Sequence, residues 1–412
     1  MFTVFQLISM ILVFATVSAL INYFFLKFPQ AIGVPVVASI LSFSFIVFNH
    51  IYGSESPFQI LIPEVKKFEF DEFLLHGILA FLLFAGATKV DISSLRKWKG
   101  QIIGLASFGV IITAFLVGTL LWGLSQLPII QADIPFIYAL LFGALIAPTD
   151  PIAAHAILKK VGAPKHLETK LVGESLFNDG TAVVMFLTVA SIIAGANPTV
   201  SSVSINLFTE IAGAIALGLI LGYVLYRLLK KVKDHSIVLL ATLAIASFSY
   251  TLAEMLHFSA PIATVICGLV IGNKSRNRLD EGTVHDLDKF WDFVDEMLNA
   301  CLFALMGLEL LVLDLNYNYL IFGAFIFVST IIGRLAGVYM TLLPYRSQTL
   351  KGTIPVLTWG GLRGGISLAL ALSLPVNEYT QILSTVTFVV VMLSLIIQGL
   401  TLEKLIKYTQ GK

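Results

Sequence analysis

The chain has 412 residues, of which 57% are hydrophobic and only 12% are charged, and its mean hydropathy is +0.91. A soluble domain carries about 25% charged residues, so this composition nearly excludes a soluble enzyme. The net charge of +1 gives no electrostatic support for nucleic acid binding. Apolar segments of bilayer-crossing length recur to the end of the chain, which predicts an all-α polytopic membrane protein embedded in a lipid bilayer.

The hydropathy pattern predicts thirteen membrane-spanning helices, here numbered as spans 1 to 13. They cover approximately Phe2–Phe25, Ala31–Phe48, Phe73–Thr88, Ile102–Leu124, Ile134–Leu158, Leu167–Ile193, Ile205–Leu229, Ser236–Met255, Ala260–Ile271, Phe290–Val312, Tyr319–Leu343, Thr353–Leu374 and Tyr379–Leu400. Span 3 is marginal and span 9 is short.

Basic residues alternate between the loops in the way that thirteen spans require. Lysine and arginine follow spans 3, 5, 7, 9, 11 and 13, whereas the loops after spans 4, 6, 8, 10 and 12 hold none. The loop after span 2, with Lys66 and Lys67, is the exception, and it also carries Glu64, Glu69, Asp71 and Glu72. Because basic loops remain cytoplasmic, the pattern places the N-terminus outside and the C-terminus in the cytoplasm.

Two spans contain sequences that interrupt a helix. Span 5 contains Ala147-Pro148-Thr149-Asp150-Pro151, whose prolines remove helix hydrogen bonds. Span 12 contains Gly360-Gly361-Leu362-Arg363-Gly364-Gly365, in which four glycines surround an arginine. Paired interruptions of this kind indicate the binding site of a secondary transporter. Spans 5 and 12 are an odd number of spans apart, so they cross in opposite directions, as an inverted repeat requires.

Few ionisable residues lie in the middle of a span, where each charge costs roughly 2.5–3.5 kcal/mol. They are Asp150, Glu174, Asp179, Arg334 and Arg363. On span 6, Ser175 and Asp179 are one helical turn apart on one face, and Glu174 lies about 100° away around the helix. Intramembrane acids usually serve function, so Asp150 and Asp179 are the first candidates for a site.

The residues around these two aspartates offer only oxygen ligands. Asp150, Thr149, Ser175 and Asp179 supply carboxylates, hydroxyls and free carbonyls, which suit an alkali or alkaline-earth ion such as Na⁺ rather than a transition metal. Two carboxyl groups close together in a low dielectric also hold a proton more readily than isolated acids in water. We therefore expect the same oxygens to bind either a proton or a cation, which is a mechanism of exchange that needs no cofactor.

The remaining charged residues have structural interpretations. A buried arginine needs a carboxylate partner, and we expect Arg334 to pair with Glu174, which leaves both aspartates free. We expect Arg363 to compensate exposed carbonyls at the break in its own span 12. Asp292, Asp295 and Glu296 lie near one end of span 10, where they form either a solvated helix end or an ion vestibule.

These sequences resemble the monovalent cation/proton antiporter family, in the branch that holds prokaryotic sodium/proton antiporters and animal sodium/proton exchangers. The stretch Gly143 to Pro151 is similar to that family's threonine-aspartate-proline element, and Glu174 to Ala182 is similar to its asparagine-aspartate element. Further similarities are Gly268 to Asn273, Phe290 to Leu311, Arg334, and Trp359 to Gly364. The resemblance covers nearly the whole chain.

The resemblance implies roles for individual residues. Asp179 matches the family's essential ion- and proton-binding aspartate, and Asp150, Thr149 and Ser175 match the other ion ligands. Asn178 stands where the electrogenic branch has an aspartate, which implies electroneutral exchange of one Na⁺ or Li⁺ for one proton. Glu174 and Arg334 match the family's stabilising ion pair.

The resemblance also implies an arrangement of domains in a prokaryotic plasma (inner) membrane. Residues 102–193 and 319–405 would form a core domain that moves as an elevator, and residues 1–88 and 236–312 a dimerisation domain that makes a homodimer. Residues 205–229 would link the two domains, and residues 406–412 would form a short cytoplasmic tail. Some family members carry a glutamate in span 3 that reaches the ion through water, and Ala85 stands at that position here.

Three other functions remain open from the sequence. A potassium/proton or calcium/proton antiporter of the same fold would use the same oxygens. An intramembrane aspartyl protease also uses two aspartates, but its glycine-x-glycine-aspartate element is absent around Asp179. A cation channel would need a continuous pore with filter residues, and no filter-like repeat appears.

Overall fold

The computed structural model describes residues 4–52, 70–128, 130, 132–196, 200–275, 279–313, 316–350 and 352–410. Helices joined by short loops make up this part of the chain, and no strand occurs within it. Lys66 and Lys67, the first two residues of span 1 and the last two residues of the expected cytoplasmic tail lie outside the described residues.

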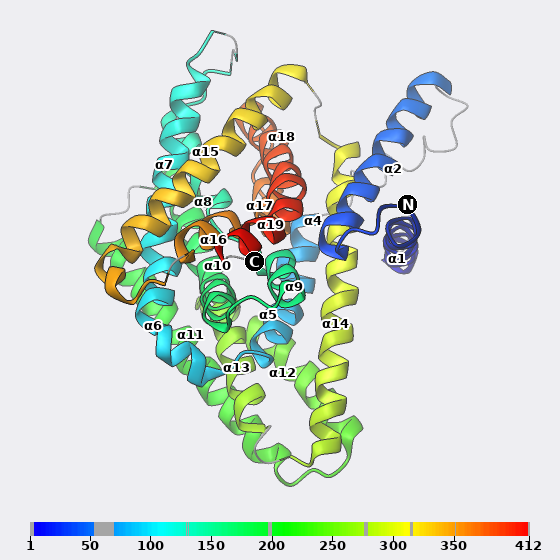
Figure 1. The fold of residues 1–412 in the computed structure, drawn as a ribbon, viewed down its shortest axis with the longest axis vertical. Coiled ribbons are helices and arrows are strands. Elements are labelled where there is room, and N and C mark those ends of the chain that lie inside the picture. The colour runs from blue at the N-terminus through cyan, green and yellow to red at the C-terminus, as the bar shows by residue number, and fades with distance from the viewer. Residues whose placement is uncertain are drawn as a thin grey trace.

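The helices are labelled α1 to α19 in chain order in Figure 1. The helices are α1 (Val4–Ile21), α2 (Gln30–Tyr52), α4 (Phe70–Glu72), α5 (Leu79–Thr88), α6 (Ile92–Gly104), α7 (Val110–Ser125), α8 (Phe136–Ile146), α9 (Pro151–Val161), α10 (Lys165–Ile193), α11 (Val200–Leu229), α12 (His235–Met255), α13 (Ala260–Ser275), α14 (Glu281–Leu308), α15 (Tyr317–Leu342), α16 (Thr353–Trp359), α17 (Gly365–Leu372), α18 (Glu378–Leu393) and α19 (Gly399–Thr409). Turns of π-helix follow α1 and join α4 to α5, α6 to α7 and α18 to α19; they are Asn22–Leu26, Phe73–Ile78, Leu105–Gly109 and Ser394–Gln398. Turns of 3₁₀-helix extend α14 and α15; they are Glu309–Leu311 and Leu343–Gln348.

Each predicted span falls on one helix or on consecutive helices, so the prediction of an all-α polytopic membrane protein is confirmed. Nine helices within the described ranges are long and apolar enough to cross a membrane. Two shorter apolar helices, Phe73–Thr88 and Ala260–Lys274, coincide with the marginal span 3 and the short span 9. Spans 5 and 12 are interrupted where the sequence predicted, between α8 and α9 and between α16 and α17.

Two helices begin earlier than the predicted spans because acidic residues cap their first turns. The Asp91 carboxylate accepts hydrogen bonds from the amides of Ser93 and Ser94, and α6 therefore starts at Ile92. Asp280 accepts from the amide of Thr283 and starts α14. The polar first turns of α6 and α14 thus extend beyond the apolar segments that the hydropathy pattern could detect.

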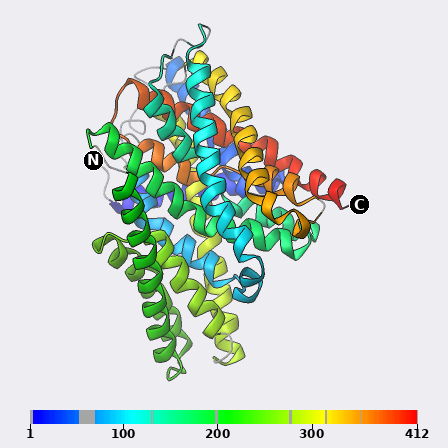
Figure 2. The ribbon, with the colours of Figure 1, turned by 90° about the vertical axis from the view of Figure 1, so that its left-hand side faces the viewer.

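The helices pack in two groups. In one group α7 packs against α8 and α15, α15 against α18, and α10 against α6 and α8. In the other, α13 packs against α5, α11 and α12, and α14 against α1, α2 and α5. Figures 1 and 2 show α11, α12 and α13 extending from one end of the molecule.

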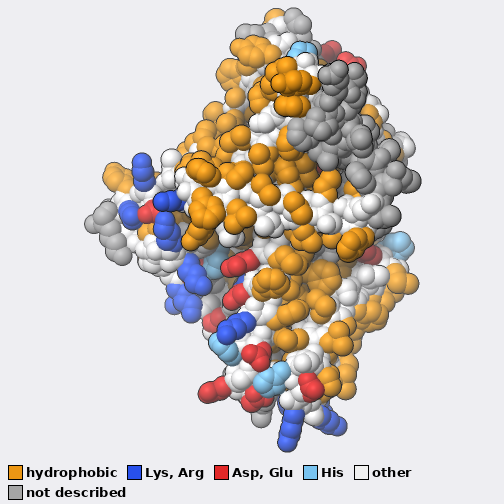
Figure 3. Space-filling view, turned by 90° about the vertical axis from the view of Figure 1, so that its right-hand side faces the viewer, with side chains coloured by type: hydrophobic (Ala, Val, Ile, Leu, Met, Phe, Trp, Pro, Cys, Tyr) orange, Lys and Arg blue, Asp and Glu red, His pale blue; other side chains and the backbone are white. Residues whose placement is uncertain are grey.

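The surface is that of a membrane protein. Apolar side chains cover much of the face in Figure 3, and charged side chains gather toward its lower left. Large apolar side chains are exposed along α1, α2 and α11, among them Phe5, Phe43 and Phe208. Such extensive apolar exposure fits a lipid environment better than water.

Candidate functional site

The two helix breaks contact each other inside the protein. The backbone amide of Asp150, in the first break, donates to the carbonyl of Leu362 in the second, at 2.8 Å. The guanidinium of Arg363 donates through Nη1 to the carbonyls of Ala147 and Pro148, the latter at 2.9 Å. Buried carbonyls left without helical donors at the first break therefore receive donors from the opposite break.

This contact corrects the expectation for Arg363. We expected its charge to compensate carbonyls in its own span 12, but Nη1 contacts the end of α8 in span 5 instead. At the break in span 12, the last turn of α16 instead receives its donors from Arg334. Arg334 donates to the carbonyl of Leu357 through Nε at 3.3 Å and Nη2 at 3.2 Å. Each helix C-terminus at a break thus faces an arginine, the sign that the helix dipole favours.

Arg334 and Glu174 form the ion pair that the sequence predicted. Arg334 Nη1 contacts Glu174 Oε1, and Nη2 donates to Oε2 at 2.8 Å, so the pair is bidentate. The two side chains are 3% and 0% exposed, which makes the guanidinium the essential partner of the carboxylate. The pair joins α10 to α15 and, through Leu357, to α16.

Asp150 lies where two helix N-termini meet. It is the N-cap of α9, and its Oδ1 accepts from the Ile152 amide at 2.8 Å. Gly364 is the N-cap of α17, and a Cβ built on it would overlap the Asp150 carboxylate. Glycine therefore allows the carboxylate to approach the α17 N-terminus, where the helix dipole favours a negative charge.

Thr149, Ser175 and Asn178 form a buried polar cluster beside Asp150. The hydroxyls of Thr149 and Ser175 lie 3.1 Å apart, and Asn178 Nδ2 donates to Thr149 Oγ1 at 2.8 Å. All three side chains are buried. Asn178 thus orients the Thr149 hydroxyl from the α10 side of the break.

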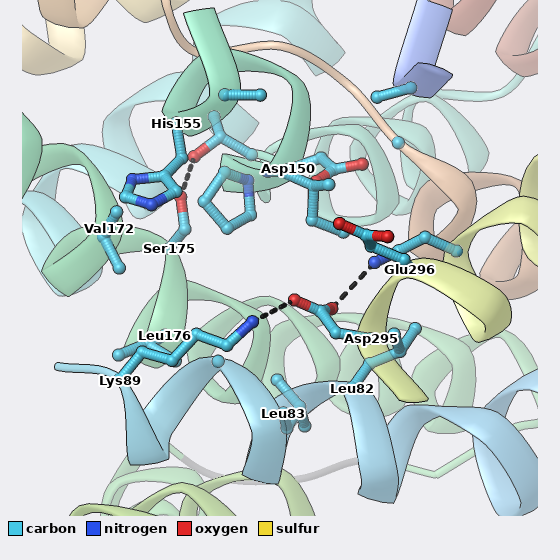
Figure 4. Close-up of a pocket in the computed structure, with 18 of the residues that line it drawn as sticks. Leu82, Leu83, Lys89, Asp150, His155, Val172, Ser175, Leu176, Asp295 and Glu296 are labelled. Carbon is cyan, nitrogen blue, oxygen red and sulfur yellow. Dashed lines mark hydrogen bonds and ion pairs between the residues drawn. The ribbon is translucent and has the colours of Figure 1, made fainter. Parts of the chain in front are cut away.

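One cavity of about 1090 Å³ brings the four predicted ion ligands together. Thr149, Asp150, Ser175 and Asp179 all line it, and Figure 4 shows Asp150 and Ser175 at its edge. Asp179 is only 5% exposed, so the cavity reaches it deep within α10. Carboxylates and hydroxyls that line one cavity are a ligand set for a hard cation and also acceptors for a proton.

The opposite wall of the cavity was not assigned from the sequence. Asp292, Asp295 and Asn299 of α14 line it, and Lys89, which follows α5, pairs with both aspartates. Figure 4 shows the contact of Lys89 with Asp295. The sequence left the acidic end of span 10 undecided between a solvated helix end and a vestibule, and these residues line the cavity. The available signal was the acidic cluster itself, but nothing in the sequence indicated that Lys89 reaches it.

Two further sequence positions bear on the site. Ala85 is fully buried in an apolar cluster with Phe84 and Cys267, so span 3 contributes no carboxylate to the cavity at this position. His155 Nδ1 of α9 lies 3.4 Å from Glu168 Oε1 of α10, and both residues line the cavity. That pair connects the two helices that hold Asp150 and Asp179.

Comparisons with known proteins match nearly the whole chain. The family model described as "Sodium/hydrogen exchanger, transmembrane" matches residues 5–408. The Na(+)/H(+) antiporter NhaP of Pseudomonas aeruginosa is 41% identical over 414 residues, which cover 98% of this chain and 96% of that protein. The Na(+)/H(+) antiporter NhaH of Halobacillus aidingensis is 33% identical over 412 residues, again covering 98% and 96%. The solved structure of the sodium proton antiporter MjNhaP1 from Methanocaldococcus jannaschii at pH 8 shares the fold, with a TM-score of 0.76, 22% identity and 99% coverage of both chains.

Proposed function

Because this chain belongs to the sodium/hydrogen exchanger family, we propose that it exchanges sodium or lithium ions for protons across a membrane. The family consists of transporters rather than enzymes, which removes the aspartyl protease from consideration. The single observation that supports a site for this exchange is the cavity in which Asp150, Asp179, Thr149 and Ser175 lie together.

Competition at this site would couple the two ions. An alkali ion bound by the two carboxylates and the two hydroxyls excludes a proton from the same oxygens. A proton on either carboxylate removes a negative charge and an acceptor that the cation needs. Binding of one ion therefore requires release of the other, and no separate coupling device is needed.

We propose a stoichiometry of one cation per proton. Asp150 and Asp179 are the titratable residues among the proposed ligands, and their neighbour Asn178 is an amide that neither binds nor releases a proton near neutral pH. Exchange of one Na⁺ for one H⁺ at this pair leaves the charge of the site unchanged. Transport would then be electrically silent.

The cavity also supports an orientation in the membrane. Its lysines follow the odd-numbered spans: Lys27, Lys89, Lys159, Lys160 and Lys165. Because basic loops are retained in the cytoplasm, we propose that the cavity opens inward, with the N-terminus outside and the C-terminus in the cytoplasm of a prokaryote. Elevator motion of residues 102–193 and 319–405 against a homodimer of residues 1–88 and 236–312 would then carry the site outward.

Proton flux in sealed vesicles tests the proposal. The purified full chain is reconstituted into proteoliposomes with an acid interior, and sodium, lithium, potassium or calcium is added outside. We expect sodium and lithium to dissipate the pH gradient, and a potassium ionophore to leave the rate unchanged. Dissipation of the pH gradient by potassium or calcium alone would establish the corresponding alternative antiporter. Cation flux that is not exchanged for protons would establish a channel.

A further inference from the structure

Lys89, which follows α5, places a positive charge against the α14 wall of the cavity. Lys89 Nζ lies 2.8 Å from Asp292 Oδ1 and 2.8 Å from Asp295 Oδ2. Burial alone would lower the pKa of Lys89, but the carboxylates of Asp295 and Asp292 more than offset this effect, and its pKa lies above the ordinary value. The ammonium group is therefore charged while it contacts both carboxylates.

The side-chain amide of Asn299, which contacts Asp295, has an unpartnered carbonyl oxygen among the described residues. Asn299 Nδ2 donates to Asp295 Oδ1 at 2.8 Å, and because a carboxylate only accepts, this contact fixes the orientation of the amide. Asn299 Oδ1 then has no hydrogen-bond partner among the described residues, although Asn299 is only 6% exposed and lines the cavity. This contact holds the Asn299 amide, with its unpartnered carbonyl oxygen, against the Asp295 carboxylate, and both groups supply oxygens of the kind that a hard cation binds.

We propose that Asp292, Asp295 and the side-chain carbonyl of Asn299 form a second, transient binding position for an alkali cation, which the Lys89 ammonium occupies until that cation displaces it. The inference rests on the proposed function, since the same cation would then pass to Asp150 and Asp179 across the cavity. The lysine sets how readily the cation is admitted.

The exposure of these groups makes the exchange of ammonium for cation feasible. The side chains of Lys89 and Asp292 are 34% and 61% exposed, so solvent weakens their attraction and the lysine can move aside. A position on a transport path must bind firmly enough to attract the ion and weakly enough to release it. Competition with a tethered ammonium provides that weak binding.

Transport kinetics test the role of Lys89. In proteoliposomes, Lys89→Gln removes the competing charge and is expected to lower the KM for sodium about 2- to 5-fold, the range that partly exposed ion pairs support. Lys89→Arg keeps the charge and is expected to keep the KM. Lys165→Gln removes a different lysine from the same cavity and is the matched control. An unchanged or higher KM in Lys89→Gln, or an equal fall in Lys165→Gln, would overturn the proposal.

Direct binding separates the second position from the paired aspartates. Radioactive sodium is bound to the purified full chain carrying Asp179→Asn, with and without Lys89→Gln. We expect sodium binding to appear only with Lys89→Gln added, and to be lost again with Asn299→Leu or Asp295→Asn. If unmodified protein shows sodium-driven proton flux but no binding appears in this series, only the second position is wrong. If unmodified protein shows no such flux, the proposed function itself fails.

Discussion

The amide of Asp150 and the carbonyl of Leu362 are joined by a 2.8 Å hydrogen bond, which ties the two interrupted spans together at their breaks. Arg363 strengthens the same junction through the carbonyls of Ala147 and Pro148. A proposed ion ligand is thus held by backbone from the opposite span, so a movement of one break should displace Asp150 as well. The predictions below follow from this arrangement.

Gly364→Ala should impair exchange by displacing Asp150. The added methyl group would overlap the Asp150 carboxylate, so the carboxylate or the α17 N-terminus must shift. We expect sodium-driven proton flux to fall at least tenfold, with the protein still eluting as a folded species. Gly86→Ala is the control, because Gly86 also lines the cavity but its Cβ would meet only Leu176 Cδ2 at 3.9 Å. Equal flux in the two variants would show that the glycine at position 364 is not needed.

Arg363→Leu should destabilise the protein. The substitution leaves the buried carbonyls of Ala147 and Pro148 without the donor that they now share, and unsatisfied buried groups cost about 1–3 kcal/mol each. We expect a clear fall in melting temperature in detergent. Arg346→Leu, at an exposed arginine, should change the melting temperature little. Similar melting temperatures for the two variants would contradict this account of the junction.

Glu174→Gln should also destabilise the protein, but without altering the proposed ion ligands. It leaves the buried Arg334 charge without its carboxylate, a loss of about 3–5 kcal/mol. The control Glu403→Gln breaks partly exposed contacts with Lys160 and Lys407 and should cost under about 1 kcal/mol.

A double substitution measures the coupling within that pair. Glu174→Gln with Arg334→Gln should be less destabilising than the sum of the single changes, because no unpaired charge remains. The KM for sodium of the folded fraction should stay within twofold of the original value. A large change in KM with normal stability would instead make Glu174 an ion ligand.

Local sequence predicted the features that depend on local chemistry. Two prolines around Thr149 and Asp150 were enough to place the first break, and the glycines around Arg363 placed the second. Glu174 and Arg334 could be paired because a buried guanidinium in an apolar stretch has few possible partners. Hydropathy was enough to place even the short apolar helix of span 9.

Partners in space could not be predicted where several were chemically equivalent. Arg363 could equally have reached the carbonyls of its own break, and the packing of α17 against α8 brings it to Ala147 and Pro148 instead. Lys89 reaches Asp292 and Asp295 because α5 packs against α14, which no local pattern encodes. The polar first turns of α6 and α14 were missed because hydropathy detects only the apolar part of a helix.

The central claim is that Asp150 and Asp179 hold either a proton or an alkali ion, and sodium affinity as a function of pH tests it most directly. Calorimetric titration of the purified chain should show the apparent Kd for sodium falling about tenfold for each unit of rising pH, until the site is deprotonated and the Kd levels off. The same titration should release protons to the buffer, and Asp179→Asn should abolish both signals. A sodium affinity that does not depend on pH, or binding that persists undiminished in Asp179→Asn, would contradict the account.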